Sequence, residues 1–142
     1  MPGRPLHILL VEDDDVDAEL IVRGFRSRQG EQLITVARNG LEALDILRGL
    51  SGHAKPVQPY LILTDINMPQ MNGFEFLREL RRDPQLRQSM VFVLTGSALE
   101  TDMRVAYGQQ IAGYLLKAKV ATDFSLLVSL VQCYHEHVAF PP

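Results

Sequence analysis

Five short apolar runs divide the 142-residue chain, and segments with helical spacing lie between them. The runs are rich in Leu, Ile and Val and cover 6–11, 33–37, 60–64, 90–95 and 113–116. Continuous apolar runs of this length are typical of strands that are buried on both faces of a sheet. The alternation therefore predicts an α/β fold with three layers, a doubly wound five-stranded parallel sheet joined by right-handed helical crossovers.

The segments between the runs space apolar residues by three or four, as amphipathic helices do. The positions expected to face the core are Val16, Leu20, Gly24 and Phe25 in the first helix, Leu41, Leu44 and Leu47 in the second, Phe74, Leu77 and Leu80 in the third, and Leu99, Met103 and Ala106 in the fourth. The stretch 51–59 contains Gly and two Pro and is predicted to be a surface loop.

Length and composition favour a single domain over 1–142, with a core at about 6–137 and a short tail at 138–142. No uncharged apolar stretch approaches the roughly 20 residues that span a bilayer, so a membrane segment is not expected. The single cysteine, Cys133, agrees with a reducing compartment, and we expect a cytoplasmic protein. A net charge of −3 without a basic run argues against nucleic-acid binding.

Acidic residues follow two of the predicted strands. Glu12 and Asp13 come directly after the first, Asp65 after the third, while Thr95 ends the fourth and Lys117 follows the fifth. The carboxyl ends of parallel strands meet at one edge of the sheet, so these five side chains should line one cleft. Carboxylates about 4 Å apart repel by roughly 4 kcal/mol at an effective dielectric near 20, so the cleft needs a compensating cation.

Oxygen ligands without neighbouring His or Cys favour Mg²⁺. We predict Asp13 and Asp65 as direct ligands and Glu12 as a ligand through water. Asp65 can also act as a nucleophile on phosphorus, while the Lys117 ammonium and the Thr95 hydroxyl stabilise the phosphoryl oxygens.

The neighbouring acids Asp14, Asp15 and Asp17 are interpreted as residues of a helix N-terminus and not as ligands.

Four motifs in order resemble the receiver domain of two-component response regulators, over about residues 6–137. They are Val11-Glu12-Asp13, Thr64-Asp65-Ile66-Asn67-Met68-Pro69 with Asn72-Gly73, Leu94-Thr95-Gly96-Ser97, and Tyr114-Leu115-Leu116-Lys117. The resemblance implies a flavodoxin-like, CheY-like fold with strand order 2-1-3-4-5. It also implies that Asp65 accepts a phosphoryl group from a histidine kinase or a small phosphodonor, and that the chain catalyses only this uptake and its loss.

By the same resemblance, Asp13, Asp65 and the backbone carbonyl of Asn67 would hold Mg²⁺. Thr95 and Tyr114 would form a switch pair that changes the face made by the fourth helix, the fifth strand and the fifth helix. The loop 51–59, the run 116–119 and the Pro-ended tail are further similar to small stand-alone regulators paired with phytochrome-type kinases.

One position departs from the family, because Ala118 stands where receivers usually have a proline after the lysine. A cis bond before a non-proline residue costs about 2.5–4 kcal/mol, so the sequence leaves open whether the Lys117–Ala118 peptide is cis or trans. A degenerate receiver that binds a partner without phosphorylation is therefore one alternative.

Two other classes compete with the receiver. A phosphohydrolase of the haloacid dehalogenase type would need a second acid where Asn67 stands. A Rossmann-type nucleotide site would need a Gly-rich turn where the first strand leads into acids.

The last helix has no charged residue from Phe124 to Tyr134. One apolar stripe is expected to face the core: Phe124, Leu127, Val128, Val131 and Tyr134. A second stripe, Leu126, Leu130 and Cys133, would stay exposed in a monomer. It predicts a homodimer or a partner contact, which the tail extends, unless the tail folds back over the stripe.

Overall fold

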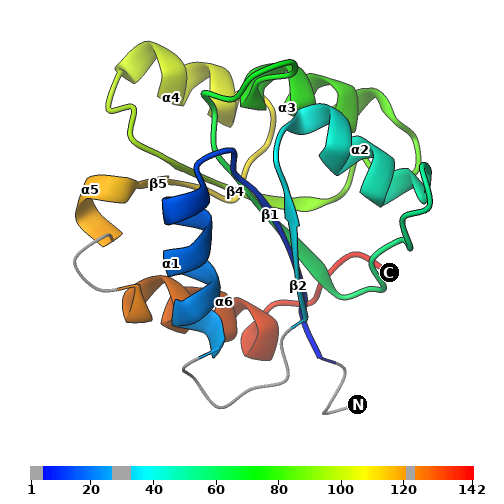
Figure 1. The fold of residues 1–142 in the computed structure, drawn as a ribbon, viewed down its shortest axis with the longest axis horizontal. Helices are drawn as coiled ribbons and strands as arrows, with labels where there is room; N and C mark the ends of the chain where they lie inside the picture. Colours follow the sequence, from blue (N-terminus) through cyan, green and yellow to red (C-terminus); the bar gives the residue numbers. More distant parts are fainter. Residues whose placement is uncertain (1–4, 27–32, 121–123) are drawn as a thin grey trace.

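The computed structural model describes residues 5–26, 33–120 and 124–142, and its five strands form one parallel sheet (Figure 1). The strands are β1 His7–Val11, β2 Leu33–Ala37, β3 Tyr60–Thr64, β4 Met90–Thr95 and β5 Gly113–Leu116. Their order is β2-β1-β3-β4-β5, and every neighbouring pair is parallel. The predicted fold class and strand order are confirmed, and β1 begins one residue later than the predicted run.

The helices are α1 Asp15–Arg26, α2 Gly40–Arg48, α3 Gly73–Arg82, α4 Glu100–Tyr107, α5 Lys117–Val120 and α6 Ser125–His137. The short helix α5 was not predicted, and the expected fifth helix is α6. Within the described part of the chain, no helix has the length and apolar character needed to cross a membrane.

Helices cover both faces of the sheet, with α2, α3 and α4 on one side and α1 and α6 on the other (Figure 1). Alternate residues of each central strand enter opposite cores, as the period of two requires. In β1, Leu9 and Val11 enter the core under α2 and α3, whereas Ile8 and Leu10 enter the core under α1 and α6. The continuous apolar runs therefore reflect burial of the strands on both faces.

The predicted core face of α1 is confirmed at Phe25, which is buried, and wrong at Val16 and Leu20. Val16 and Leu20 are 66% and 42% exposed, while Ala18, Ile21 and Phe25 are buried. The buried stripe of Ala18, Ile21 and Phe25 also has helical spacing, and it faces the core because Ile21 and Phe25 pack with α6.

Smaller differences affect α2, α3 and α4. Leu41 and Leu99 are exposed, and Phe74 and Met103 are only partly buried. Leu99 precedes the first turn of α4, where it occupies the N-cap position and is not part of the helical face.

The core stripe of α6 is confirmed, with Leu127, Val128 and Val131 buried. Of the second stripe, Leu126 is 61% exposed and Cys133 is exposed, but Leu130 is partly buried against the core cluster. The exposed stripe is therefore narrower than predicted.

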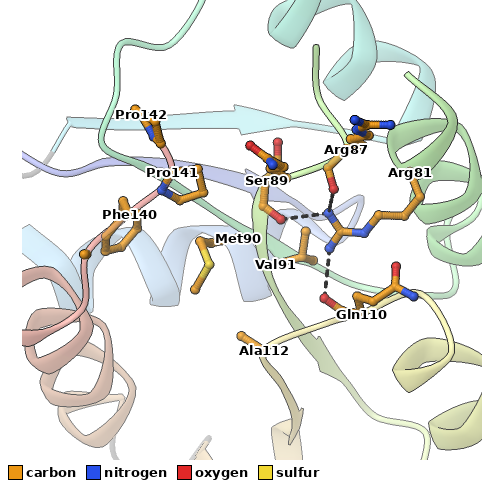
Figure 2. A pocket seen from close by; sticks show the side chains of 12 residues that line it. Arg81, Arg87, Ser89, Met90, Val91, Gln110, Ala112, Phe140, Pro141 and Pro142 are labelled. Carbon is orange, nitrogen blue, oxygen red and sulfur yellow. Dashed lines mark hydrogen bonds between the residues drawn. The ribbon is translucent and has the colours of Figure 1, made fainter. Parts of the chain in front are cut away.

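The tail runs back toward the amino end of β4 (Figure 2). Phe140 packs against the core on the α1–α6 side, and Met90 and Ala112 line a groove of about 600 Å³ with the tail. Since Leu126 and Cys133 stay exposed, the tail does not cover the second stripe.

Candidate functional site

Three strand ends place acidic and basic side chains at one edge of the sheet. β1 and β3 are neighbours, and the Asp65 backbone N–H donates to the Val11 carbonyl at 2.9 Å. The Glu12 N–H donates to the Ala37 carbonyl of β2 at 2.9 Å. Lys117 follows β5, and its side chain reaches toward β3 across the end of β4. The structure therefore brings Glu12, Asp65 and Lys117 together, as the sequence predicted.

The Lys117 ammonium lies among three carboxylates. Its Nζ atom is 2.6 Å from Glu12 Oε1, 2.7 Å from Asp17 Oδ2 and 2.8 Å from Asp65 Oδ2. Asp17 was predicted to serve only the helix N-terminus, so its contact with Lys117 was missed. No local sequence signal indicated this contact, because a helix N-terminus by itself accounts for an acid in its first turn.

Glu12, Asp13 and Asp65 can offer ligand atoms that lie within 4.8 Å of one another. Asp13 is exposed, while Glu12 and Asp65 are buried. A set of three carboxylates without His or Cys fits Mg²⁺, which binds through a few carboxylates and keeps several waters. The donor set therefore agrees with the metal expected from the sequence.

The ionisation of the site reflects its burial. Burial raises the pKa of Glu12 to about 7, since the opposing hydrogen bond from Lys117 does not offset the loss of solvent, and the Asp65 charge adds to the rise. Burial alone would lower the pKa of Lys117, but hydrogen bonds to Asp17, Asp65 and Glu12 outweigh it, so the pKa of Lys117 is raised. Lys117 therefore stays protonated, and the cleft holds more carboxylates than this one ammonium neutralises.

The backbone after Asp65 fixes the orientation of its carboxylate. Asp65 Oδ1 accepts from the Ile66 N–H at 2.6 Å, which leaves Oδ2 for Lys117. Gly73 packs against this loop so closely that a Cβ atom there would lie 2.3 Å from the Asp65 carbonyl oxygen. Asn72 begins α3 with a capping box to Glu75. The Asn72-Gly73 pair thus both starts α3 and allows it to approach the site.

Thr95 and Tyr114, the predicted switch pair, lie on neighbouring strands. Thr95 is fully buried, and its hydroxyl oxygen accepts from the Ser97 N–H at 3.4 Å. The Tyr114 hydroxyl donates to the Ser97 carbonyl at 2.9 Å. Both residues therefore contact Ser97, whose hydroxyl donates to Asp102 at 2.5 Å. Ser97 was part of a quoted motif but had no role assigned from the sequence.

Asp14 and Asp15 near β1, and Asn67 after β3, differ in their surroundings. Asp14 Oδ1 accepts from the Asp17 N–H at 2.9 Å, which confirms a capping role for Asp14 at the start of α1. Asp15 forms an ion pair with Arg38. Asn67 is exposed after β3, in the position from which its carbonyl was expected to bind the metal.

The Lys117–Ala118 peptide bond, whose conformation the sequence left open, is trans. Among the described residues, Gln58–Pro59 is the single cis peptide, so the Lys117–Ala118 bond is trans. Lys117 nevertheless contacts Asp65. Replacement of the usual proline does not remove the lysine from the site.

The fold and this cleft define a class of protein that comparison with known families identifies. The response regulator receiver domain family matches residues 8–128. The chain belongs to this family, whose members are signalling domains and not enzymes in their own right. The phosphohydrolase and Rossmann alternatives are thereby excluded.

Several relatives match most of the chain. The probable methanogenesis regulatory protein FilR2 of Methanothrix harundinacea (strain 6Ac) is 35% identical over 130 residues, covering 92% of this chain and 83% of its own length. The response regulator Rcp1 of Synechocystis sp. (strain ATCC 27184 / PCC 6803 / Kazusa) is 31% identical over 138 residues, covering 96% of this chain and 94% of its own length.

Two solved structures agree in fold. The phosphorylated cyanobacterial phytochrome response regulator RcpA superposes with a TM-score of 0.88 at 29% identity, over 98% of this chain and 100% of the other. The Mn²⁺-bound form of response regulator Rcp1 superposes with a TM-score of 0.83 at 30% identity, over 97% of this chain and 100% of the other. The chain is therefore similar to phytochrome-associated response regulators over nearly its whole length.

Proposed function

We propose that this receiver is a phosphorylation-controlled switch in which Asp65 accepts a phosphoryl group in a Mg²⁺-dependent reaction. The observation that carries the proposal is the position of the Asp65 carboxylate. It lies at the carboxyl end of β3, 2.8 Å from the Lys117 ammonium and within the Glu12–Asp13–Asp65 cluster. A nucleophile, an ammonium and a set of metal ligands at one point are the requirements of phosphoryl transfer.

In the proposed step, one carboxylate oxygen of Asp65 forms a bond to phosphorus as the bond between phosphorus and the donor breaks. With acetyl phosphate, the leaving group departs as acetate. The Lys117 ammonium, already bound to Asp65, donates to an oxygen of the incoming group. Thr95 ends β4 at the same edge of the sheet, and its hydroxyl would serve as a second donor after release from the Ser97 N–H.

Asp13, Asp65 and the Asn67 carbonyl would hold the metal, with Glu12 acting through water. Glu12 and Asp65 both accept from the Lys117 ammonium, at 2.6 and 2.8 Å. When bound, Mg²⁺ neutralises charge on the transferring oxygens. The solved Mn²⁺-bound form of Rcp1 supports a divalent ion in a relative of this chain.

Intact mass spectrometry tests the phosphoacceptor. After incubation with acetyl phosphate and Mg²⁺, the wild type should gain one phosphoryl group, and Asp65→Asn should gain none. Asp45→Asn, which changes an acid of α2 that bonds Ser51 away from the site, should gain one like the wild type. A wild type without gain would favour the degenerate receiver.

We also propose Thr95 and Tyr114 as the pair that reports phosphorylation to the face formed by α4, β5 and α6. Tyr114 bridges β5 to the loop after β4 through its bond to the Ser97 carbonyl. Movement of the Thr95 hydroxyl toward a phosphoryl group would release Ser97 and change the setting of Tyr114. NMR chemical shifts of methyl and amide groups on α4 should change on addition of acetyl phosphate in the wild type. In Thr95→Val they should not change.

The proposed phosphodonor is a sensor histidine kinase of the phytochrome type in the cytoplasm. The similarity to RcpA, a cyanobacterial phytochrome response regulator, supports this partner. Phosphotransfer from a phytochrome-type kinase should be faster than from an unrelated histidine kinase at equal concentration. Equal rates would remove the assignment of kinase type.

The exposed part of α6 is the proposed contact for a second copy of the chain. Leu126 and Cys133 stand exposed on a helix that has no charge from Phe124 to Tyr134. Sedimentation velocity should show a dimer for the wild type and a monomer for Leu126→Glu. Leu50→Glu, at an exposed leucine beyond α2, should remain dimeric. A monomeric wild type would contradict the proposal.

A further inference from the structure

Within the described part of the chain, Asp17 contacts the candidate site through Lys117. Its Oδ2 atom accepts from the Lys117 Nζ at 2.7 Å, and the two residues are 100 positions apart in the sequence. Asp17 is not among the three carboxylates that come within metal-binding distance of one another. Asp17 lies in the first turn of α1. It binds the Lys117 ammonium but is not part of the Glu12–Asp13–Asp65 cluster.

We propose that Asp17 is a positioning residue that holds the Lys117 ammonium at the site while Glu12 and Asp65 change partners. This inference rests on the proposed function of Asp65 as phosphoacceptor. A divalent cation attracts the Glu12 and Asp65 oxygens that now bind Lys117 and repels the ammonium itself. Among the residues that the structure describes, Asp17 is the third carboxylate bound to Lys117, so the ammonium keeps this contact until a phosphoryl group arrives.

The local backbone explains why such a contact is useful in this chain. Lys117 is the first residue of α5, a helix of four residues, and it is followed by Ala118 through a trans peptide. A lysine side chain has four rotatable bonds, so holding its end in one place costs rotamer entropy. A carboxylate on α1, a helix of twelve residues packed against α6, supplies a rigid anchor from outside this short segment.

Asp15 provides a matched control. It lies in the same first turn of α1 and carries the same charge, but it pairs with Arg38 and not with Lys117. Asp15→Ala therefore removes the same charge from the same helix end without removing the Lys117 contact. Asp17→Glu keeps the charge and should restore most of the function.

Two measurements test the proposal. The first is the initial rate of phosphoryl gain from acetyl phosphate at saturating Mg²⁺, followed by intact mass. Asp17→Ala should slow it about fivefold, the size expected for loss of a partly exposed ion pair, with the Mg²⁺ concentration for half-maximal rate changed less than about twofold. Asp15→Ala should stay within about twofold of the wild type.

The second measurement is the ¹⁵N–¹H signal of the Lys117 ammonium without phosphodonor but with Mg²⁺, assigned by its loss in Lys117→Met. The signal should persist in the wild type, Asp15→Ala and Asp17→Glu and disappear through faster exchange in Asp17→Ala. An unchanged signal in Asp17→Ala overturns the proposal, and so does a lost signal with an unchanged rate. A wild type that gains no phosphoryl group overturns the proposed function instead, a distinct result because this signal needs no phosphodonor.

Discussion

The Lys117 Nζ atom lies 2.8 Å from Asp65 Oδ2, although 52 residues separate the two positions. β4 stands between their strands in the sheet, so the lysine side chain crosses the end of β4 to make the contact. The contact therefore depends on the order and the register of three strands. This position of the ammonium beside the Asp65 carboxylate supports the proposed phosphoryl transfer to Asp65.

We predict that Mg²⁺ binding weakens as the pH falls below 7. The folded-state pKa of Glu12 is about 7, above its ordinary value of 4.5, because the side chain is buried. A metal cluster requires the charged carboxylate, so below pH 7 binding displaces a proton from Glu12, and the apparent affinity falls by up to about tenfold per pH unit. Isothermal titration calorimetry at about pH 6, 7 and 8 measures the apparent Mg²⁺ affinity.

The raised pKa of Glu12 has the opposite effect on the stability of the metal-free protein, which falls as the pH rises. Between the two pKa values the folded state binds more protons than the unfolded state, so the contribution of Glu12 to stability falls as the pH rises toward 7. Glu12→Gln should reduce both dependences. Equal Mg²⁺ affinities of the wild type at pH 6 and pH 8 would contradict the prediction.

Gly73→Ala should destabilise the protein by about 2–4 kcal/mol, the range of severe local overpacking. A Cβ atom would lie 2.3 Å from the Asp65 carbonyl oxygen and 2.8 Å from the Ile66 Cα, and both are backbone atoms that cannot turn away. Urea unfolding measures the change. Gly96→Ala is the control, because a Cβ atom there meets nothing within 4 Å, and it should change stability by less than about 0.5 kcal/mol.

Arg81→Lys should cost about 2 kcal/mol of stability, because the guanidinium binds two segments of backbone, 87–89 and 109–110. It donates to the carbonyls of Arg87, Ser89 and Gln110 at 2.7, 2.9 and 3.0 Å (Figure 2). It also donates to the carbonyl of Gln109 at 2.7 Å. An ammonium lacks the planar set of donors that reaches all of them.

Thermal unfolding would measure the loss at Arg81. The neighbouring Arg82, whose side chain is 70% exposed and lies 3.9 Å from Glu79, is the matched control. Arg82→Lys should leave the midpoint nearly unchanged. Similar shifts for both variants would show that the carbonyl contacts contribute little.

Tyr114→Phe should lower stability by about 0.5–1.5 kcal/mol, the net value of one hydrogen bond. The change removes the bond from the Tyr114 hydroxyl to the Ser97 carbonyl and keeps the ring in place. Tyr134→Phe is the control, since the ring of Tyr134 packs edge-on against Phe92 at 4.9 Å and this contact survives. Equal shifts of the denaturant midpoint in Tyr114→Phe and Tyr134→Phe would show that the hydrogen bond to Ser97 adds no measurable stability.

The sequence predicted the strands well because burial on both faces leaves one consistent signal. β2, β3, β4 and β5 have the predicted bounds, since a parallel strand covered by helices is apolar throughout. The face of α1 was predicted less well. Phe25 was placed correctly, but Val16 and Leu20 have the same spacing of four as Ile21 and Phe25. Only packing against α6 puts Ile21 in the core.

The cleft residues Glu12, Asp65 and Lys117 could be found from the sequence because each directly follows a strand, and strand ends share one edge in a parallel sheet. Asp17 could not be assigned in the same way. A carboxylate in the first turn of a helix is satisfied by the helix N-terminus alone, so nothing local distinguishes it from Asp15.

Local pattern along the chain thus determined the elements, their order and the strand ends that carry charged side chains. The tertiary structure decided which carboxylates share the Lys117 ammonium, that this ammonium is held by α1 as well as by the strand ends, and which side of α1 is buried. The physical reason is the range of the interactions. Propensity and periodicity act between neighbours in sequence, whereas the partner of a charged side chain depends on where distant segments pack.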